Sequence, residues 1–140
     1  MNNSITNCLW VDGKAKEMAE FYCIVFPNSK ITSVNPIVVN FQLNGHKFMA
    51  LNGGPNFKFN ESISFMISCD NQEEVDYYWE KLTNEGKEGM CGWLEDKFGV
   101  SWQVVPSVLG QLMGDPEKAE RVTKVFMGMK KLVIAELKDA

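Results

Sequence analysis

Few side chains in this sequence of 140 residues could carry nucleophilic chemistry. The only histidine, His46, directly follows Asn44-Gly45, a dipeptide typical of a two-residue hairpin turn. A Cys–His or Ser–His pair would need His46 together with an acid that orients it, and none can be assigned. We therefore predict a solvent-exposed His46 and no nucleophile constellation.

The thiols do not form a metal-binding or disulfide pattern. No two cysteines are spaced as CxxC, and no zinc-type spacing occurs. Each cysteine adjoins apolar residues in an expected helix or strand, which favours buried, reduced thiols over disulfides. The four positions are Cys8, Cys23, Cys69 and Cys91.

Four acidic residues occupy positions where local structure explains them. Glu95 and Asp96 fall in a turn that ends at Gly99. Asp12 and Asp70 each follow an expected strand and precede an expected helix, which favours a helix-entry cap. We assign these four acids structural roles.

Composition limits the class of protein. The net charge is −4 without a basic stripe, so nucleic acid is not expected as a partner. No apolar run approaches the roughly 20 residues of a membrane helix, and no secretion signal opens the chain. With 45% apolar residues, we expect one folded cytoplasmic domain.

Hydrophobic periodicity predicts an order of elements that occurs twice. The first copy comprises a strand at 5–11, a helix at 14–25, and strands at 30–34, 37–43 and 47–51. The second comprises a strand at 63–69, a helix at 71–85, a weak strand at 87–89, and strands at 90–94 and 100–105. Two tail helices are expected, one from Asp115-Pro116 and a short one at 132–138.

Matching residues support a true internal repeat. Asp12 and Asp70 end the first strands at an offset of 58, and Phe21-Tyr22 and Tyr77-Tyr78 match at an offset of 56. The joint is Asn52-Gly53-Gly54-Pro55, which cannot continue a strand. We predict two βαβββ modules, residues 4–54 and 60–106, and a helical tail, 107–140, within one domain.

Several motifs recur in known proteins: Leu9-Trp10-Val11-Asp12-Gly13, Phe21-Tyr22, Phe26-Pro27, Ala50-Leu51-Asn52-Gly53-Gly54-Pro55, Tyr78-Trp79, Cys91-Gly92-Trp93 and the segment from Asp96 to Pro106. In this order they resemble the PhnB-like branch of the vicinal-oxygen-chelate superfamily, which includes glyoxalase I and bleomycin-resistance proteins. Members are often labelled 3-demethylubiquinone-9 3-methyltransferase. The resemblance implies an α+β fold, a curved sheet around a cavity with helices outside, and a homodimer.

The resemblance also implies where metal-using relatives place their ligands. Those positions fall at Asn7 (or Ile5), at Ser62 (or Ser64), and at Gln103 on the last strand. Because divalent transition metals normally need imidazole, thiolate or carboxylate ligands, we expect no metal. The strand-to-helix turns lack the glycine-rich pattern of a nucleotide cofactor site, so no cofactor is expected.

Polar but non-ligating residues at these positions favour a metal-free small-molecule-binding protein whose ligand the sequence does not name. An enzyme is the alternative, either the methyltransferase of the family label or a lyase or isomerase with an atypical site. A structural dimer with an empty pocket is a third class. Trp93 could face the ligand or the helices, and Asn52 could be a turn residue or a contact. The expected ligand-binding residues are Asn7, Asn52, Ser62, Trp93, Ser101 and Gln103.

Overall fold

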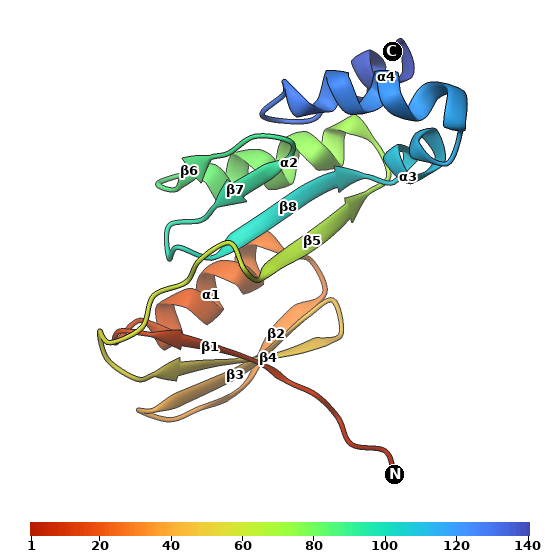
Figure 1. Ribbon diagram of the computed structural model, residues 1–140. Helices are drawn as coiled ribbons and strands as arrows, with labels where there is room; N and C mark the ends of the chain where they lie inside the picture. Colours follow the sequence, from red (N-terminus) through yellow and green to blue (C-terminus); the bar gives the residue numbers. More distant parts are fainter. The chain divides into compact units, whose positions relative to one another are not determined.

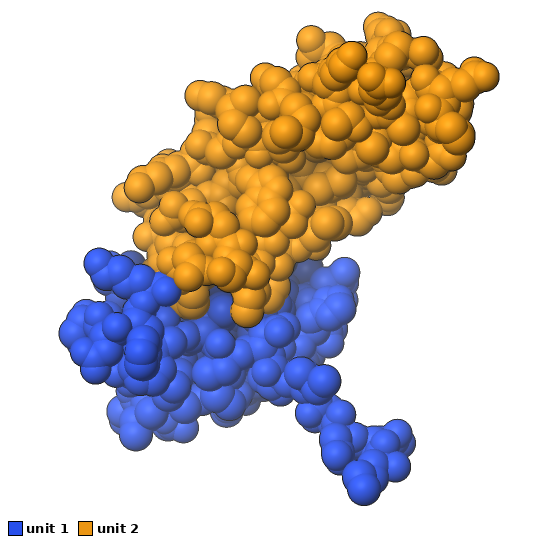
Figure 2. All heavy atoms as spheres, viewed as in Figure 1, with its two compact units in different colours: residues 1–58 blue, residues 59–140 orange.

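The computed structural model describes residues 1–140 and divides them into two compact units. Unit 1 comprises Met1–Lys58 and unit 2 comprises Phe59–Ala140 (Figure 2). That the two units form a single domain stays a prediction.

Unit 1 is a four-stranded mixed sheet with one helix (Figure 1). The strands lie in the order β1-β4-β3-β2, with β1 parallel to β4 and the other neighbours antiparallel. Its elements are β1 (Asn7–Val11), α1 (Ala15–Val25), β2 (Ser29–Val34), β3 (Val38–Leu43) and β4 (His46–Asn52).

The core of unit 1 lies between α1 and one face of this sheet. Apolar residues recur on α1 at three- and four-residue steps, which places them on one side of the helix. Alternate strand residues supply the facing side chains. The buried set is Leu9, Val11, Ala15, Met18, Ala19, Tyr22, Val25, Phe26, Val39, Phe41, Leu43, Phe48 and Ala50.

The hairpin between β3 and β4 forms at the predicted dipeptide. Asn44 and Gly45 have φ values of 48° and 84°, the left-handed conformation that this turn requires. His46 begins β4 and is exposed, which confirms its predicted position.

Unit 2 repeats this topology. Its strand order β5-β8-β7-β6 matches that of unit 1 position by position, again with one parallel pair, β5 with β8. This match confirms the repeat and the α+β class. The elements are β5 (Ser64–Cys69), α2 (Gln72–Thr83), β6 (Lys87–Glu88), β7 (Trp93–Glu95) and β8 (Ser101–Pro106).

The core of unit 2 lies under α2. Val75, Trp79 and Leu82 are buried on one side of this helix, as their spacing predicts. The sheet supplies alternate residues, and Trp102 and Val104 of β8 are 3% and 0% exposed. Trp102 and Val104 therefore face the helix.

The cap roles predicted for two aspartates are wrong. Asn71 is the N-cap of α2, and its Oδ1 accepts from the Glu74 amide, while Glu74 Oε1 accepts from the Asp70 amide. The N-cap position of α1 is Lys14, not Asp12, and it makes no side-chain cap bond.

Two further expectations need correction. The strand predicted at 90–94 begins only at Trp93, because Cys91 and Gly92 have φ values of 61° and 83°. The four cysteines are free, but only Cys69 is buried; Cys8 is exposed, and Cys23 and Cys91 are half-buried.

The tail contains three helices, of which the sequence analysis missed the first. They are α3 (Val108–Met113), α4 (Pro116–Met127) and α5 (Ile134–Lys138). They enclose a small apolar cluster around Val122, Leu132 and Leu137. None of the helices has the length and apolar character needed to cross a membrane.

Candidate functional site on the sheet of unit 2

The sheet of unit 2 has two faces of different character. One packs against α2 through Leu94, Trp102 and Val104. The other, which we call the distal face, carries the alternate residues of the same strands. The distal face consists of Ser64, Met66 and Ser68 from β5, Ser101, Gln103 and Val105 from β8, Trp93 and Glu95 from β7, and Lys87 from β6.

Strand register aligns the polar side chains of the distal face in a row. Ser64 pairs with Ser101, Ser101 with Glu95, and Glu95 with Lys87. Paired residues share a face of the sheet, so the row crosses all four strands. We call these four residues the polar row.

A second row lies beside the polar row, two residues further along β8. Gln103 pairs with Met66 on one side and with Trp93 on the other. This register answers the question that the sequence left open about Trp93: its indole shares the face of Gln103, and the ring is half-buried. An aromatic ring, an amide and a thioether therefore adjoin the polar row.

Gln103 is half-buried and has a partner within the sheet. Its Nε2 donates to Ser64 Oγ at 2.9 Å. The predicted placement of Ser62 beside Gln103 is wrong, because Ser62 is exposed in the turn before β5, where its amide donates to Asn60 Oδ1. The alternative position, Ser64, is the one that contacts Gln103.

Glu95 is a member of the site that the sequence analysis missed. It is the last residue of β7, is half-buried, and forms no ion pair or side-chain hydrogen bond. Gly99 has a φ of 89°, and a Cβ there would lie 3.6 Å from Glu95 Oε1. Alternation with the apolar Leu94 was the signal that could have placed Glu95 on this face.

Asp96 has the structural role predicted for it. The residue is 2% exposed, and its Oδ1 accepts from the amides of Phe98 and Val100. Its Oδ2 accepts from Trp102 Nε1 at 2.8 Å. The carboxylate thus holds the turn between β7 and β8 and fixes the indole beneath the sheet, which leaves Glu95 as the acid of the distal face.

The predicted inward position of Asn7 is wrong. Side chains along β1 alternate between two faces, so Asn7 lies on the same face as Leu9 and Val11. The helix α1 covers that face. On β1 the residues that face away from α1 are therefore Cys8 and Trp10.

Asn52 uses both of its side-chain polar groups within unit 1. Its Oδ1 accepts from the Ala15 amide at 2.9 Å, and its Nδ2 donates to the Pro36 carbonyl at 3.1 Å. Because Lys14 supplies no cap, Asn52 caps the start of α1 from a neighbouring strand. This geometry supports the interpretation of Asn52 as a structural residue.

Burial raises the pKa of two groups on the α2 side of the sheet or on α2 itself. Burial, with smaller contributions from Glu74 and Asp70, raises the pKa of the Cys69 thiol to about 11. Burial also raises the pKa of Tyr78. Cys69 therefore stays a neutral thiol near pH 7, which excludes it as a ready nucleophile.

The comparisons with known proteins define the class. The description of the family model that matches residues 3–105 is 3-demethylubiquinone-9 3-methyltransferase. The chain therefore belongs to this family, the PhnB-like branch of the vicinal-oxygen-chelate superfamily. The tail lies outside the match. No curated protein matches the sequence.

Solved structures agree with this assignment. A PhnB protein from Bacillus cereus, described provisionally as a 3-demethylubiquinone-9 3-methyltransferase, is 32% identical with a TM-score of 0.71 over 75% of this chain and 100% of its own. A glyoxalase-related enzyme from Fulvimarina pelagi is 14% identical, with a TM-score of 0.58 over 78% and 91%. A fosfomycin resistance protein from Listeria monocytogenes, solved with Mn(II) and sulfate, is 13% identical, with a TM-score of 0.60 over 81% and 97%. The last two show the fold alone.

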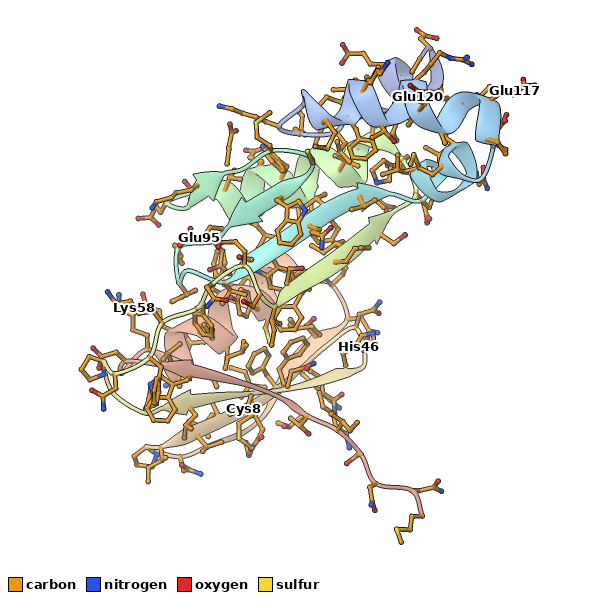
Figure 3. The ribbon with its side chains drawn as sticks, in the orientation of Figure 1. Cys8, His46, Lys58, Glu95, Glu117 and Glu120 are labelled. Atoms are coloured by element: carbon orange, nitrogen blue, oxygen red, sulfur yellow. The ribbon has the colours of Figure 1, made fainter.

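The residues present do not fit a divalent transition metal. The distal face offers one carboxylate, Glu95, with amide and hydroxyl groups and no imidazole. No three side chains of the His, Cys, Asp and Glu types come together anywhere in the chain. His46 lies at the β3–β4 hairpin of unit 1, and Glu117 and Glu120 lie on α4 of unit 2 (Figure 3).

The glycines do not fit a nucleotide-type methyl donor either. Such cofactors rest on a glycine-rich turn between a strand and a helix. Gly53 and Gly54 follow β4 and lead into a loop. The space beside Gly53 is filled by the Trp10 indole, whose Nε1 donates to the Gly54 carbonyl at 2.9 Å. These glycines therefore serve packing in unit 1.

Proposed function

We propose that this chain is a metal-free small-molecule-binding protein and that its ligand is held on the distal face of the unit 2 sheet. The observation that carries the proposal is the Gln103–Ser64 pair beside Trp93. An amide can donate and accept at once, and Ser64 accepts only one of the two Nε2 hydrogens. Gln103 thus keeps a donor and an acceptor for a polar ligand group, and Trp93 offers an apolar surface.

The proposal is tested by native mass spectrometry of purified protein, with elemental analysis of the same sample. We expect a retained organic molecule and no stoichiometric transition metal. Gln103→Leu should fold normally and lose the molecule, because it removes both hydrogen-bonding groups while keeping a similar volume. Gln111→Leu, at an exposed position of α3, is the matched control and should retain it.

Two outcomes contradict the proposal. A stoichiometric metal in the wild-type protein would show that the side chains present do bind a transition metal. Equal retention by Gln103→Leu and by the wild type would place the ligand elsewhere. The homodimer implied by the family resemblance stays a prediction, which sedimentation velocity at micromolar concentration tests.

A further inference from the structure

The carboxylate of Glu95 is unusual among the acids of this chain. Asp96, next in sequence, satisfies its carboxylate with three hydrogen bonds. Glu88, across from β7, accepts from Trp79 Nε1 and pairs with Lys130. Glu95 is half-buried and has neither kind of partner. A charged group that is partly removed from water without compensation raises the free energy of the folded state.

The side chains around Glu95 do not neutralise it. Lys87 is its register partner on β6, but the two form no ion pair, and Lys87 is exposed. Ser101, the partner on β8, is 4% exposed and can donate at most one hydrogen bond. Gly99 carries no side chain beside Oε1. The carboxylate thus keeps acceptor positions for a group supplied from outside the sheet.

Trp93 lies two residues before Glu95 on the same strand and the same face. Side chains at this spacing are roughly 7 Å apart. A ligand whose flat apolar group packs against the indole would therefore need only a short linker to reach the Glu95 carboxylate. The amide of Gln103 would lie beside the flat group.

We propose that the ligand of this site carries a cationic hydrogen-bond donor, an ammonium or amidinium group, joined by a short linker to a flat apolar group. Glu95 binds the cation and Trp93 packs against the flat part. The inference rests on the proposed function, because it assigns a ligand class to the same face. It makes Glu95 the residue that determines specificity by charge.

Three phenyl probes of matched length test the charge preference: 2-phenylethylammonium, 2-phenylethanol and 3-phenylpropionate. Each is titrated into the full chain at pH 7, and the indole N–H resonance of Trp93, assigned with Trp93→Phe, reports binding. We expect the cation to bind about tenfold more tightly than the alcohol, as a charge-assisted hydrogen bond would give. The carboxylate probe should bind most weakly.

The variant Glu95→Gln keeps the shape and removes the charge. It should bind the cation and the alcohol equally, whereas Gln103→Leu should weaken all three probes together. Glu117→Gln, an exposed carboxylate on α4, is the matched control and should leave every affinity unchanged (Figure 3).

The outcomes separate the two proposals. If none of the probes shifts Trp93, the inference about Glu95 fails, and the retention test of Gln103→Leu decides the proposed function on its own. If the probes bind but the cation has no advantage, the inference about Glu95 fails and the site stands. If the cation still binds more tightly than the alcohol in Glu95→Gln, the preference comes from the indole, since aromatic faces also attract cations. That result would equally overturn the role of Glu95.

Discussion

At the scale of single residues, the indole of Trp10 occupies the space that a side chain at position 53 would need. A Cβ at this position would overlap Cδ2, Cε2 and Cζ2 of Trp10. Trp10 is held there by its hydrogen bond to the Gly54 carbonyl and by an edge contact with Phe57, with ring centroids 4.9 Å apart. The missing side chain is what allows the indole to close over the end of β4.

We predict that Gly53→Ala destabilises the protein by about 1–3 kcal/mol, the usual cost of forcing a group into a packed site. Urea denaturation measures the change, and the ¹⁹F signal of Trp10, in protein with 5-fluorotryptophan incorporated, reports the displaced ring. Gly110→Ala is the control, because a Cβ at Gly110 meets nothing within 4 Å. It lies in α3 and should gain up to about 1 kcal/mol from helix propensity. Equal midpoints for Gly53→Ala and the wild type would contradict the close packing of Trp10 against Gly53.

Residue types in the site could be read from the sequence more reliably than their orientations. Gln103, Ser101 and Trp93 lie together on one face, and their alternation with Trp102 and Val104 was visible in advance. The positions of Asn7 and Ser62 were wrong because they relied on counting residues from a relative's pattern. A shift of one residue moves a strand side chain to the other face, and only the paired register fixes it.

At the scale of elements, backbone and side-chain groups both attach the tail to the sheet and helix of unit 2. The Cys91 and Gly92 amides donate to the carbonyls of Met129 and Lys130 at 2.7 and 2.9 Å. Gln72 reaches from α2 and binds the tail twice: Nε2 donates to the Leu132 carbonyl, and Oε1 accepts from the Ile134 amide at 2.8 Å. One amide side chain thus fixes the approach to α5.

Gln72 also affects a neighbouring carboxylate. Its hydrogen bond, followed by that of Lys131, lowers the pKa of Asp76. Because the folded-state pKa is lowered, the pair of Asp76 with Lys131 of the tail stabilises the folded state above the ordinary pKa of an aspartate, and this stabilisation is lost as pH falls through the lowered value. The attachment of the tail should therefore weaken in acid.

We predict that Gln72→Ala loosens the tail while the sheet stays folded. Loss of two hydrogen bonds to the tail should cost about 1–3 kcal/mol, so exchange of the Ile134 amide should quicken about tenfold or more. The pKa of Asp76, followed by carboxyl NMR, should rise toward its ordinary value. Gln111→Ala should change neither quantity. Unchanged exchange at Ile134 in Gln72→Ala would show that the backbone pairs alone hold the tail.

Elements with clear periodicity were predictable, and those set by unusual backbone were not. The helices α1, α2 and α4 follow their apolar spacing, and α2 and α4 also begin at side-chain caps, Asn71 and Asp115. β7 starts later than predicted because Cys91 adopts a positive φ. Residues other than glycine rarely adopt this conformation, so the residue type did not predict it. α3 was missed because it has no side-chain cap and no buried residue.

At the scale of the whole molecule, the internal repeat was predictable because two independent kinds of signal agreed. The order of elements and the offsets of Asp12 with Asp70 both pointed to two copies, and the two sheets share one topology. Whether the copies behave as one domain is a question of energetics. Unit 1 has 58 residues, and a chain of about 60 residues buries only about 60% of its unfolded surface.

A unit of that size has little stability of its own, so we predict that the chain unfolds as one cooperative domain. The test destabilises unit 2 and observes unit 1. Trp79 is 5% exposed under the sheet of unit 2, and Trp79→Ala should cost about 3–5 kcal/mol. With 5-fluorotryptophan incorporated, the ¹⁹F signal of Trp10 reports unit 1 during urea denaturation. Cooperative unfolding requires the Trp10 midpoint to fall as far as those of Trp93 and Trp102, whereas Lys124→Ala, on the exposed side of α4, should move none of them. A Trp10 midpoint that stays at its wild-type value in Trp79→Ala would mean that the two units fold independently.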